Sequence, residues 1–215
     1  MNLVHGNDLA WGGWGWCLAT EQGPLSTGHV KLGGLAWRWP GVARYLDGPI
    51  SHELAEAEMM RRAHDSRVRI VIEEPPACYS GASRGGAKGG KPKAGNQAKT
   101  GYGLGTLAGA VALWSAQRPE LAYPWFVEPT PWRAWWSLGG NGRLQRKIAA
   151  RDLVRALGWG RFLDPFPWDP APEAAGGAQG DVADAILLSV GAARHADLAP
   201  RGPAQRTLAD ASTRR

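Results

Sequence analysis

The chain has 215 residues, of which 44% are hydrophobic, and its 25 Lys and Arg residues exceed its 19 Asp and Glu residues, giving a formal net charge of +6. This length suits one domain, and the hydrophobic content excludes an intrinsically disordered chain. The longest apolar runs, such as Ala110–Trp114 and Ala185–Leu188, are far too short to cross a bilayer, which excludes a membrane-spanning protein. The positive charge favours anionic partners.

The N-terminus and the cysteines indicate where the protein acts and whether disulfides or zinc stabilise it. The first residues, MNLVHGND, lack the basic flank, long apolar segment and small-residue cleavage site of a secretory signal, so we expect a cytoplasmic protein. Cys17 and Cys78 stand alone, without a CxxC pair or a neighbouring Cys/His cluster. This pattern predicts two buried thiols and neither a disulfide framework nor a zinc finger.

The first third of the chain predicts four strands and one helix. A short apolar start ends near Asp8, and the alternation of Gly with Trp after it predicts a half-buried second strand of a hairpin. The β-branched segment RVRIVIE, stopped by two prolines, predicts a strand that ends at Glu73. A strand, a helix and a strand in succession indicate a parallel crossover. The remaining expected elements are strands at Gly12–Trp16 and Gly28–Leu32 and a helix over Ile50–His64.

The rest of the chain predicts a basic loop, three helices and a strand. Residues 80–103 lack apolar periodicity and carry only positive charges, which predicts a flexible basic loop. The Ala-rich segment after it is typical of a buried helix. Arginines and lysines recur every three to five residues from Arg143 and predict a helix with a basic face, on which Arg146 and Lys147 are alternatives. The expected elements are helices over Leu104–Gln117, Arg143–Leu157 and Asp181–His195, a strand over Ala122–Val127, a Pro/Gly connector over residues 164–180 and a disordered tail over residues 198–215.

Four acidic residues fall where elements begin or end. Asp8 and Glu73 close predicted strands, and Asp181 and Asp184 open the last predicted helix, three residues apart on one face. Carboxylates at strand ends gather at one edge of a sheet, and such hard oxygen ligands suit Mg²⁺ or Mn²⁺. The same residues are also typical of a turn (Asp8), a solvated strand end (Glu73), a helix N-cap (Asp181) and a charge that favours the helix dipole (Asp184). Spacing alone leaves both interpretations open.

In this order and spacing, the segments resemble the RuvC-like Holliday junction resolvases of the RNase H-like superfamily, especially their small phage forms. The resemblance covers about residues 1–195. It is carried by Asp8 with the Trp14–Leu18 stretch, VIEEP around Glu73, GLGTLAG, PTPWRAWWSLGG, GRLQRKIAARDLV and GDVADAILLSVGAAR. It implies an α/β fold with a mixed central β-sheet flanked by α-helices, and a nuclease domain over residues 1–197.

The resemblance also implies a reaction. Asp8, Glu73, Asp181 and Asp184 would bind two Mg²⁺ ions, with Mn²⁺ as the alternative, and these would activate water and stabilise the leaving oxygen of a phosphodiester. Glu74 competes with Glu73, because alternation along a strand sends only one of them towards the site. Arg133 and Arg143 would contact the phosphate near the cut, although Arg143 also fits an ordinary solvated helix start. The implied protein is a homodimer that cuts four-way DNA junctions.

Residues outside the acidic set are candidates for contact with DNA. The cations of the 80–103 loop would bind phosphates without reading the DNA sequence; the alternative is that this loop is a solvated linker. Tyr79 and Tyr102 flank the loop and could stack on an unpaired base or pack in the core. We interpret most of the 12 Trp residues as packing residues and the five His residues as surface or satisfied side chains. Two other functions stay open, namely an RNase H-like nuclease for RNA–DNA hybrids, flaps or other branches, and a non-catalytic nucleic-acid-binding protein. The predicted DNA-binding residues are Tyr79, Arg84, Lys88, Lys91, Lys93, Lys99, Arg133, Arg143, Arg146 and Lys147.

Overall fold

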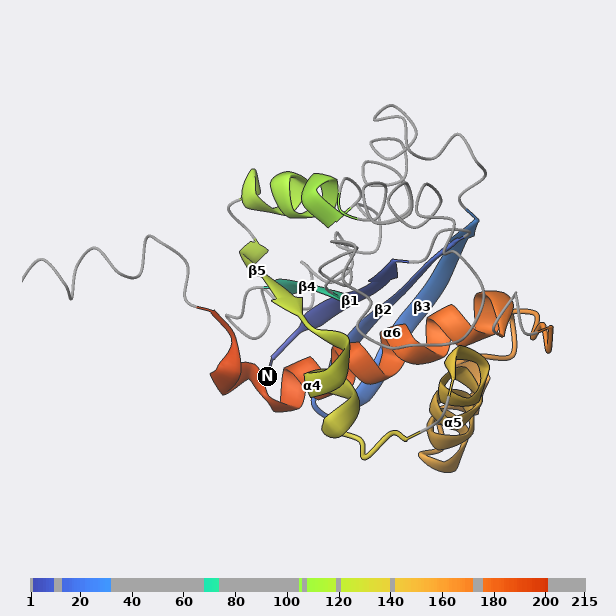
Figure 1. The fold of residues 1–215 in the computed structure, drawn as a ribbon. Coiled ribbons are helices and arrows are strands. Elements are labelled where there is room, and N and C mark those ends of the chain that lie inside the picture. Colours follow the sequence, from blue (N-terminus) through green and yellow to red (C-terminus); the bar gives the residue numbers. More distant parts are fainter. Residues whose placement is uncertain are drawn as a thin grey trace, which may run out of the picture.

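The computed structural model describes residues 2–9, 13–31, 68–73, 105, 108–118, 121–139, 142–171 and 176–200 (Figure 1). Its centre is a five-stranded mixed sheet of order β3-β2-β1-β4-β5. β1, β2 and β3 pair antiparallel, whereas β4 is parallel to both β1 and β5. The strands are β1 (Val4–Leu9), β2 (Gly13–Thr20), β3 (Gly23–Lys31), β4 (Val68–Glu73) and β5 (Leu121–Val127). The predicted α/β fold with a mixed sheet is confirmed.

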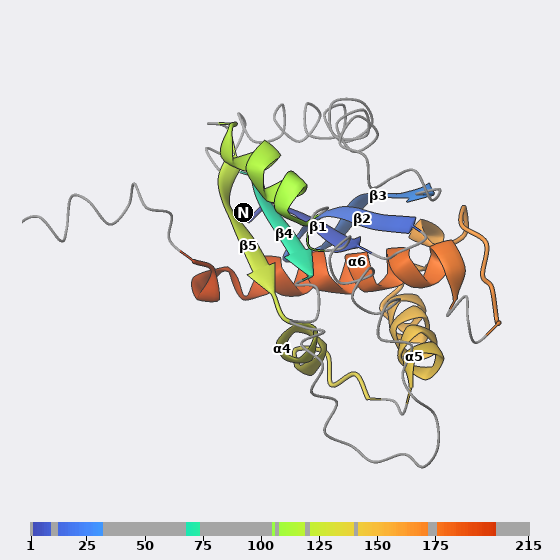
Figure 2. The ribbon, with the colours of Figure 1, turned by 45° about the horizontal axis from the view of Figure 1, so that its top comes forward.

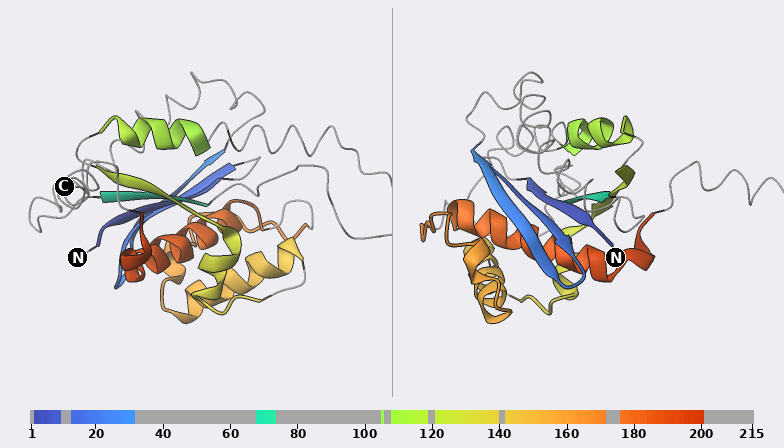
Figure 3. Two further views of the ribbon diagram at one scale, coloured as in Figure 1. Left: turned by 60° about the vertical axis from the view of Figure 1, so that its left-hand side comes forward. Right: turned by 180° about the vertical axis from the view of Figure 1, so that it is seen from behind.

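Helices cover both faces of the sheet. The long helix α6 crosses one face against β1, β2, β3 and β4, and the helical residues 108–116 lie on the opposite face (Figure 3). α4 and α5 pack on α6 on its side away from the sheet (Figure 2). The other helices in the described part of the chain are α4 (Pro129–Ala134), α5 (Arg143–Ala156) and α6 (Gly177–Arg194), with the short 3-10 turns η2 (Gly160–Phe162) and η3 (Ala196–Leu198).

The Gly/Trp alternation of β2 separates two hydrophobic cores. Trp14 and Trp16 project into the core shared with residues 108–114, and the intervening Gly15 faces α6. A Cβ atom on Gly15 would lie 2.5 Å from the backbone carbonyl of Asp181, so α6 approaches the sheet as closely as it does only because no side chain is present there. All residues of β2 are buried. The prediction of a half-buried strand is therefore wrong, because helices cover both faces.

A buried asparagine of β1 holds Trp14 in place in the core shared with residues 108–114. The Asn7 side chain donates to the carbonyl oxygens of His5 and Val71, both at 3.0 Å, and its Oδ1 accepts from Trp14 Nε1 at 3.0 Å. This arrangement satisfies the indole N–H of a tryptophan that has no exposed surface. The packing role predicted for Trp14, Trp16 and Trp114 is confirmed, and Cys17 is the expected buried thiol.

Several predicted bounds shift. β3 begins at Gly23, five residues before the expected start, and α6 begins at Gly177, four residues before Asp181. β4, β5 and α5 match their predicted ranges closely, and the described part of the Ala-rich segment is helical at 105 and 108–116. The predicted helix over Ile50–His64, the basic loop, Trp11 and Cys78 lie outside the described residues, as does the tail from 201 onwards. Across the described ranges, no helix is long and apolar enough to span a membrane.

Candidate metal centre

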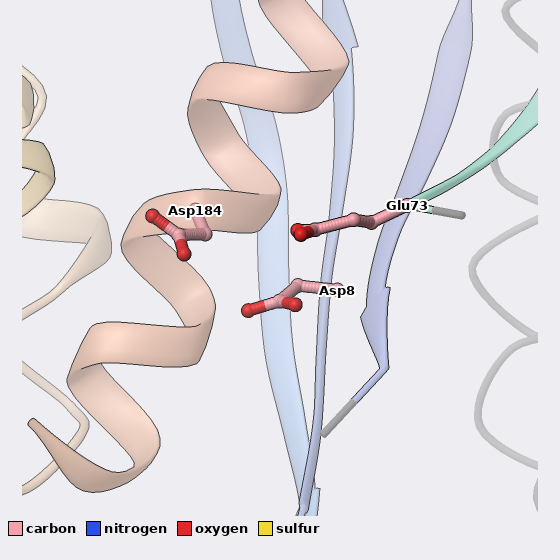
Figure 4. A group of neighbouring side chains, drawn as sticks. All are labelled: Asp8, Glu73 and Asp184. Atoms are coloured by element: carbon pink, nitrogen blue, oxygen red, sulfur yellow. The ribbon is translucent and has the colours of Figure 1, made fainter. Parts of the chain in front are cut away.

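Three of the predicted acids converge at one edge of the sheet. Asp8 comes from β1, Glu73 from the end of β4 and Asp184 from α6, and one carboxylate oxygen from each lies within 4.8 Å of the others (Figure 4). β1 and β4 are adjacent parallel strands, so their C-terminal ends reach the same edge, and α6 crosses the sheet there. The topology therefore brings together residues 65 and 111 positions apart in the sequence.

Asp181 lies one helical turn before Asp184 and occupies a different environment. Asp8, Gly15 and His29 form one row across β1, β2 and β3, and the Asp181 backbone lies over Gly15 in the middle of that row. The Asp181 side chain is 3.3 Å through Oδ2 from His29 Nε2. The helix N-cap is Gly176, so the interpretation of Asp181 as an N-cap is wrong.

Lys147 connects three of the acids. Its Nζ lies 2.7 Å from Asp8 Oδ2, 3.0 Å from Asp181 Oδ1 and 2.9 Å from Asp184 Oδ2. Lys147 is 6% exposed, whereas the sequence offered it, as the alternative to Arg146, as a member of a basic helical face that contacts DNA. The inward face of α5 is formed by residues 147, 150 and 154, which pack against α6 and bury the lysine. Lys147 is thus part of the acidic site.

Arg133 reaches the site from α4. Its Nη2 lies 3.2 Å from Glu73 Oε1 and 3.7 Å from Asp184 Oδ2. The guanidinium lies over the ring of the buried Trp132, 4.6 Å from its centroid. The PTPWR segment, which carries the predicted phosphate contact Arg133, forms a short helix that holds Arg133 beside two of the acids.

Burial and charge set the ionisation of the cluster. Burial raises the pKa of Glu73 to about 8, with the Asp8 charge adding to the effect and Arg133 opposing it. Burial also raises the pKa of Asp8 to about 6, against the attraction of Lys147. For Asp181, burial acts in the same direction, but Lys147 and His29 outweigh it and hold the pKa below its ordinary value. At pH 7 Glu73 therefore retains a proton that a bound cation would displace.

The surrounding carboxylates also act on Lys147. Burial alone would lower its pKa, but the charges of Asp184, Asp8 and Asp181 hold that pKa well above its ordinary value. Lys147 is therefore a permanent positive charge in the site at physiological pH.

The residues present fit a divalent cation. Asp8, Glu73 and Asp184 supply hard carboxylate oxygens, the ligands preferred by Mg²⁺ and Mn²⁺. Glu73 Oε2 is buried and has no hydrogen-bond partner in the described part of the chain, so it is an unsatisfied polar atom. The chemistry of this donor set and the unsatisfied oxygen both favour a metal between the three side chains.

The other predicted residues lie elsewhere. Arg143 is exposed at the first residue of α5 and Arg146 is half-buried on the same helix; among the described side chains, neither contacts the four acids. Trp132 is buried in the hydrophobic core that contains the apolar residues of α6, which agrees with the predicted packing role, and Trp136 donates from Nε1 to the Leu187 carbonyl at 2.8 Å. The positions outside the described residues are Glu74, Tyr79, Arg84, Lys88, Lys91, Lys93, Lys99 and Tyr102.

Sequence reasoning missed the parts played by His29 and Lys147. The signal for Lys147 was available, because Lys147, Ala150 and Val154 follow the spacing of a buried helical face. The signal for His29 was not, because its contact with Asp181 depends on the register of three strands and on the close approach of α6 at Gly15.

Comparisons with known proteins bear on the fold. No protein-family model matches the sequence, and no curated protein matches it. Among solved structures, the chain is similar to RuvC from Thermus thermophilus in complex with a Holliday junction substrate, with a TM-score of 0.50 and 14% identity over 92% of this chain and 96% of that chain. A second Thermus thermophilus RuvC structure gives a TM-score of 0.48 and 16% identity over 91% of this chain and 96% of that one.

The first of these comparisons agrees with the resemblance noted from the sequence motifs and with the mixed sheet flanked by helices. The chain therefore has the RNase H-like fold of the RuvC Holliday junction resolvases.

Proposed function

We propose that this protein is a divalent-metal-dependent endonuclease that hydrolyses phosphodiester bonds at four-way DNA junctions. The observation that carries the proposal is the convergence of Asp8, Glu73 and Asp184 from three separate elements at one edge of a RuvC-like sheet. In hydrolysis, a water oxygen bonds to phosphorus, the bond from phosphorus to a sugar oxygen breaks, and the leaving oxygen acquires a proton. The reaction needs no side-chain nucleophile.

The residues of the site have separate parts in this reaction. Asp8, Glu73 and Asp184 would hold the cation, which we propose to be Mg²⁺ with Mn²⁺ as the alternative; when bound, it would polarise the phosphate and lower the pKa of water. Arg133 lies beside Glu73 and Asp184, where its guanidinium can donate to a phosphate oxygen and stabilise the negative charge that builds there. Lys147 fixes the carboxylates of Asp8 and Asp184.

The proposed DNA surface extends beyond the site. Arg143 and Arg146 on α5 would contact phosphates, together with Tyr79 and the five cations of the 80–103 segment. A homodimer would place two sites across one junction, so that opposite strands are cut. We propose that residues 1–197 form this nuclease domain and that the protein acts in the cytoplasm.

A cleavage assay tests the substrate. The purified protein is incubated with Mg²⁺ and a labelled four-way junction, with duplex, flap and RNA–DNA hybrid in parallel. Paired nicks confined to the junction support the proposal and the dimer together. Cleavage of hybrid or flap instead would retain the metal centre but contradict the junction as substrate. Tight junction binding without cleavage of any substrate would favour a non-catalytic binding protein.

Replacement of Asp184 by Asn tests the site. The substitution keeps the shape of a side chain that is 3% exposed but removes the charge that a cation needs. We expect cleavage to fall by at least about 100-fold, because even groups that only support a metal ligand are worth 10- to 100-fold. Junction affinity in EDTA should stay within about threefold, since the basic surface is unchanged.

Asp164→Asn is the matched control, because Asp164 is exposed in the turn after η2. It should cleave like the unmodified protein. Cleavage retained by Asp184→Asn would remove Asp184 from the site, and equal losses in both variants would show that the assay reports something other than the metal centre.

A further inference from the structure

We infer that the ammonium group of Lys147 takes the place of one of the two divalent cations predicted from the sequence, so that the centre binds a single divalent ion through Asp8, Glu73 and Asp184. The inference rests on the proposed function, since it treats the centre as metal-dependent. It assigns Asp181 a different task from the one predicted, namely to hold Lys147.

Both carboxylate oxygens of Asp181 are engaged by side chains of the protein. Lys147 Nζ lies 3.0 Å from Oδ1, and His29 Nε2 lies 3.3 Å from Oδ2. The His29 contact depends on Gly13, where a Cβ atom would fall 2.3 Å from His29 Nε2. Both oxygens of Asp181 are thus held by side chains of the protein, and through Oδ1 this residue anchors the ammonium group of Lys147.

The other three acids are engaged on one oxygen each. Lys147 contacts Asp8 and Asp184 through their Oδ2 atoms, at 2.7 Å and 2.9 Å. Arg133 contacts Glu73 through Oε1 at 3.2 Å, and Glu73 Oε2 is the buried oxygen that lacks a partner among the described residues. One oxygen of each carboxylate is therefore outside these ion pairs, which is a ligand set for one ion.

The charges of the site support the same stoichiometry. Four carboxylates face two cationic side chains, Lys147 and Arg133, so one divalent ion makes the group neutral. A second divalent ion would leave two uncompensated positive charges beside an ammonium group that is 6% exposed. Burying unpaired charge is strongly unfavourable, and the three N–H donors of Lys147 already meet three carboxylates.

Counting bound Mn²⁺ tests the inference without measuring activity. The full-length protein is titrated with Mn²⁺, and bound ions are counted from the loss of the free-ion electron paramagnetic resonance signal. We expect one ion per chain and no spectrum of a spin-coupled pair. Two ions per chain, or a coupled pair, would overturn the inference and leave the proposed function intact. No bound ion at millimolar Mn²⁺ would overturn both.

Two substitutions distinguish an acid that binds the metal from one that only holds Lys147. Asp181→Asn keeps an oxygen for Lys147, so we expect its Mn²⁺ affinity to stay within about threefold, whereas Glu73→Gln should lose at least about tenfold. Equal losses in the two variants would make Asp181 a metal ligand and contradict the inference.

Removal of the ammonium group completes the test. Lys147→Met replaces the charge by a side chain of similar length, and we expect a second Mn²⁺ to bind once Asp181 and Asp8 lose this partner. Lys31→Met, at an exposed residue of β3, is the control and should still bind one ion. Circular dichroism verifies that each variant is folded. A folded Lys147→Met protein that binds only one ion would show that Lys147 does not occupy the place of the second cation.

Discussion

At the level of single residues, burial determines the ionisation of His5. The ring is 1% exposed and stacks on Trp16, with the ring centroids 5.3 Å apart. Neither ring nitrogen has a hydrogen-bond partner in the described part of the chain. Burial lowers the pKa of His5 from 6.5 to about 4, so the folded protein keeps this imidazole neutral at pH 7.

This shift predicts a loss of stability in mild acid. Between pH 6.5 and pH 4 the unfolded chain binds a proton at His5 that the folded chain does not, so the free energy of unfolding falls as the pH is lowered through this range. From pH 7.5 to pH 5 the loss due to His5 is about 2 kcal/mol. Urea unfolding at the two pH values measures it in the unmodified protein and in His5→Phe, which keeps an aromatic ring against Trp16.

The His5→Phe variant should lose about 2 kcal/mol less than the unmodified protein over this pH range. His195→Phe is the control, because His195 stacks on Trp135 at the partly exposed end of α6. Identical pH dependence in the unmodified protein and in His5→Phe would contradict a neutral buried His5.

The chemical identity of the acidic residues was readable from the sequence, but their partners were not. Glu73 closes β4 as predicted, because a β-branched run stopped by prolines defines a strand end, whereas β1 continues one residue beyond Asp8 to Leu9. The spacing of Lys147, Ala150 and Val154 indicated which face of α5 is buried, but the three acids that Lys147 contacts belong to β1 and α6 and depend on tertiary packing. His29 was interpreted as a surface or satisfied side chain, because its contact with Asp181 joins β3 to a residue of α6 that lies 152 positions away, and local sequence does not encode such a contact.

At the level of secondary structure, the Gly residues of β2 determine how closely α6 approaches. A Cβ atom at Gly15 would lie 2.5 Å from the Asp181 carbonyl group and 2.9 Å from the Val182 backbone nitrogen. Backbone atoms cannot rotate away, so Gly15→Ala must displace α6 or the strand. We expect the free energy of unfolding to fall by about 1–3 kcal/mol and Mn²⁺ binding to weaken, because Asp184 moves with α6.

Gly105→Ala is the comparison, because a Cβ atom there meets no atom within 4 Å. Thermal unfolding and Mn²⁺ titration of both variants test the difference. If Gly15→Ala is as stable as Gly105→Ala, then the approach of α6 at this point does not depend on the missing side chain.

Element types were predicted better than element lengths. The mixed strand pattern, the Ala-rich helix and α5 are where the sequence placed them. α6 begins earlier than Asp181, at Gly177, because the left-handed Gly176, with φ 89°, starts it inside a segment that composition marked as a connector. The burial of all of β2 was also missed, since a local pattern cannot show that a second helix covers the far face.

At the level of the whole molecule, the net charge of +6 predicts salt-sensitive binding to DNA. The segment Ser83–Ala98 contains four of the cations predicted to contact phosphates, at positions 84, 88, 91 and 93. Each phosphate contact contributes about 0.9 to the slope of log affinity against log salt concentration, so deleting this segment should reduce the slope for a four-way junction by up to about 3 to 4.

A second variant separates charge from chain length. Replacing Arg84, Lys88, Lys91 and Lys93 by Gln keeps the segment at full length and should reduce the slope as much as the deletion does, because counterion release depends on charge alone. Mn²⁺ binding should be unchanged in both variants, since the metal ligands lie on β1, β4 and α6. A slope that stays constant in the Gln variant would make the segment a linker and assign the phosphate contacts to Arg133, Arg143 and Arg146 on α4 and α5.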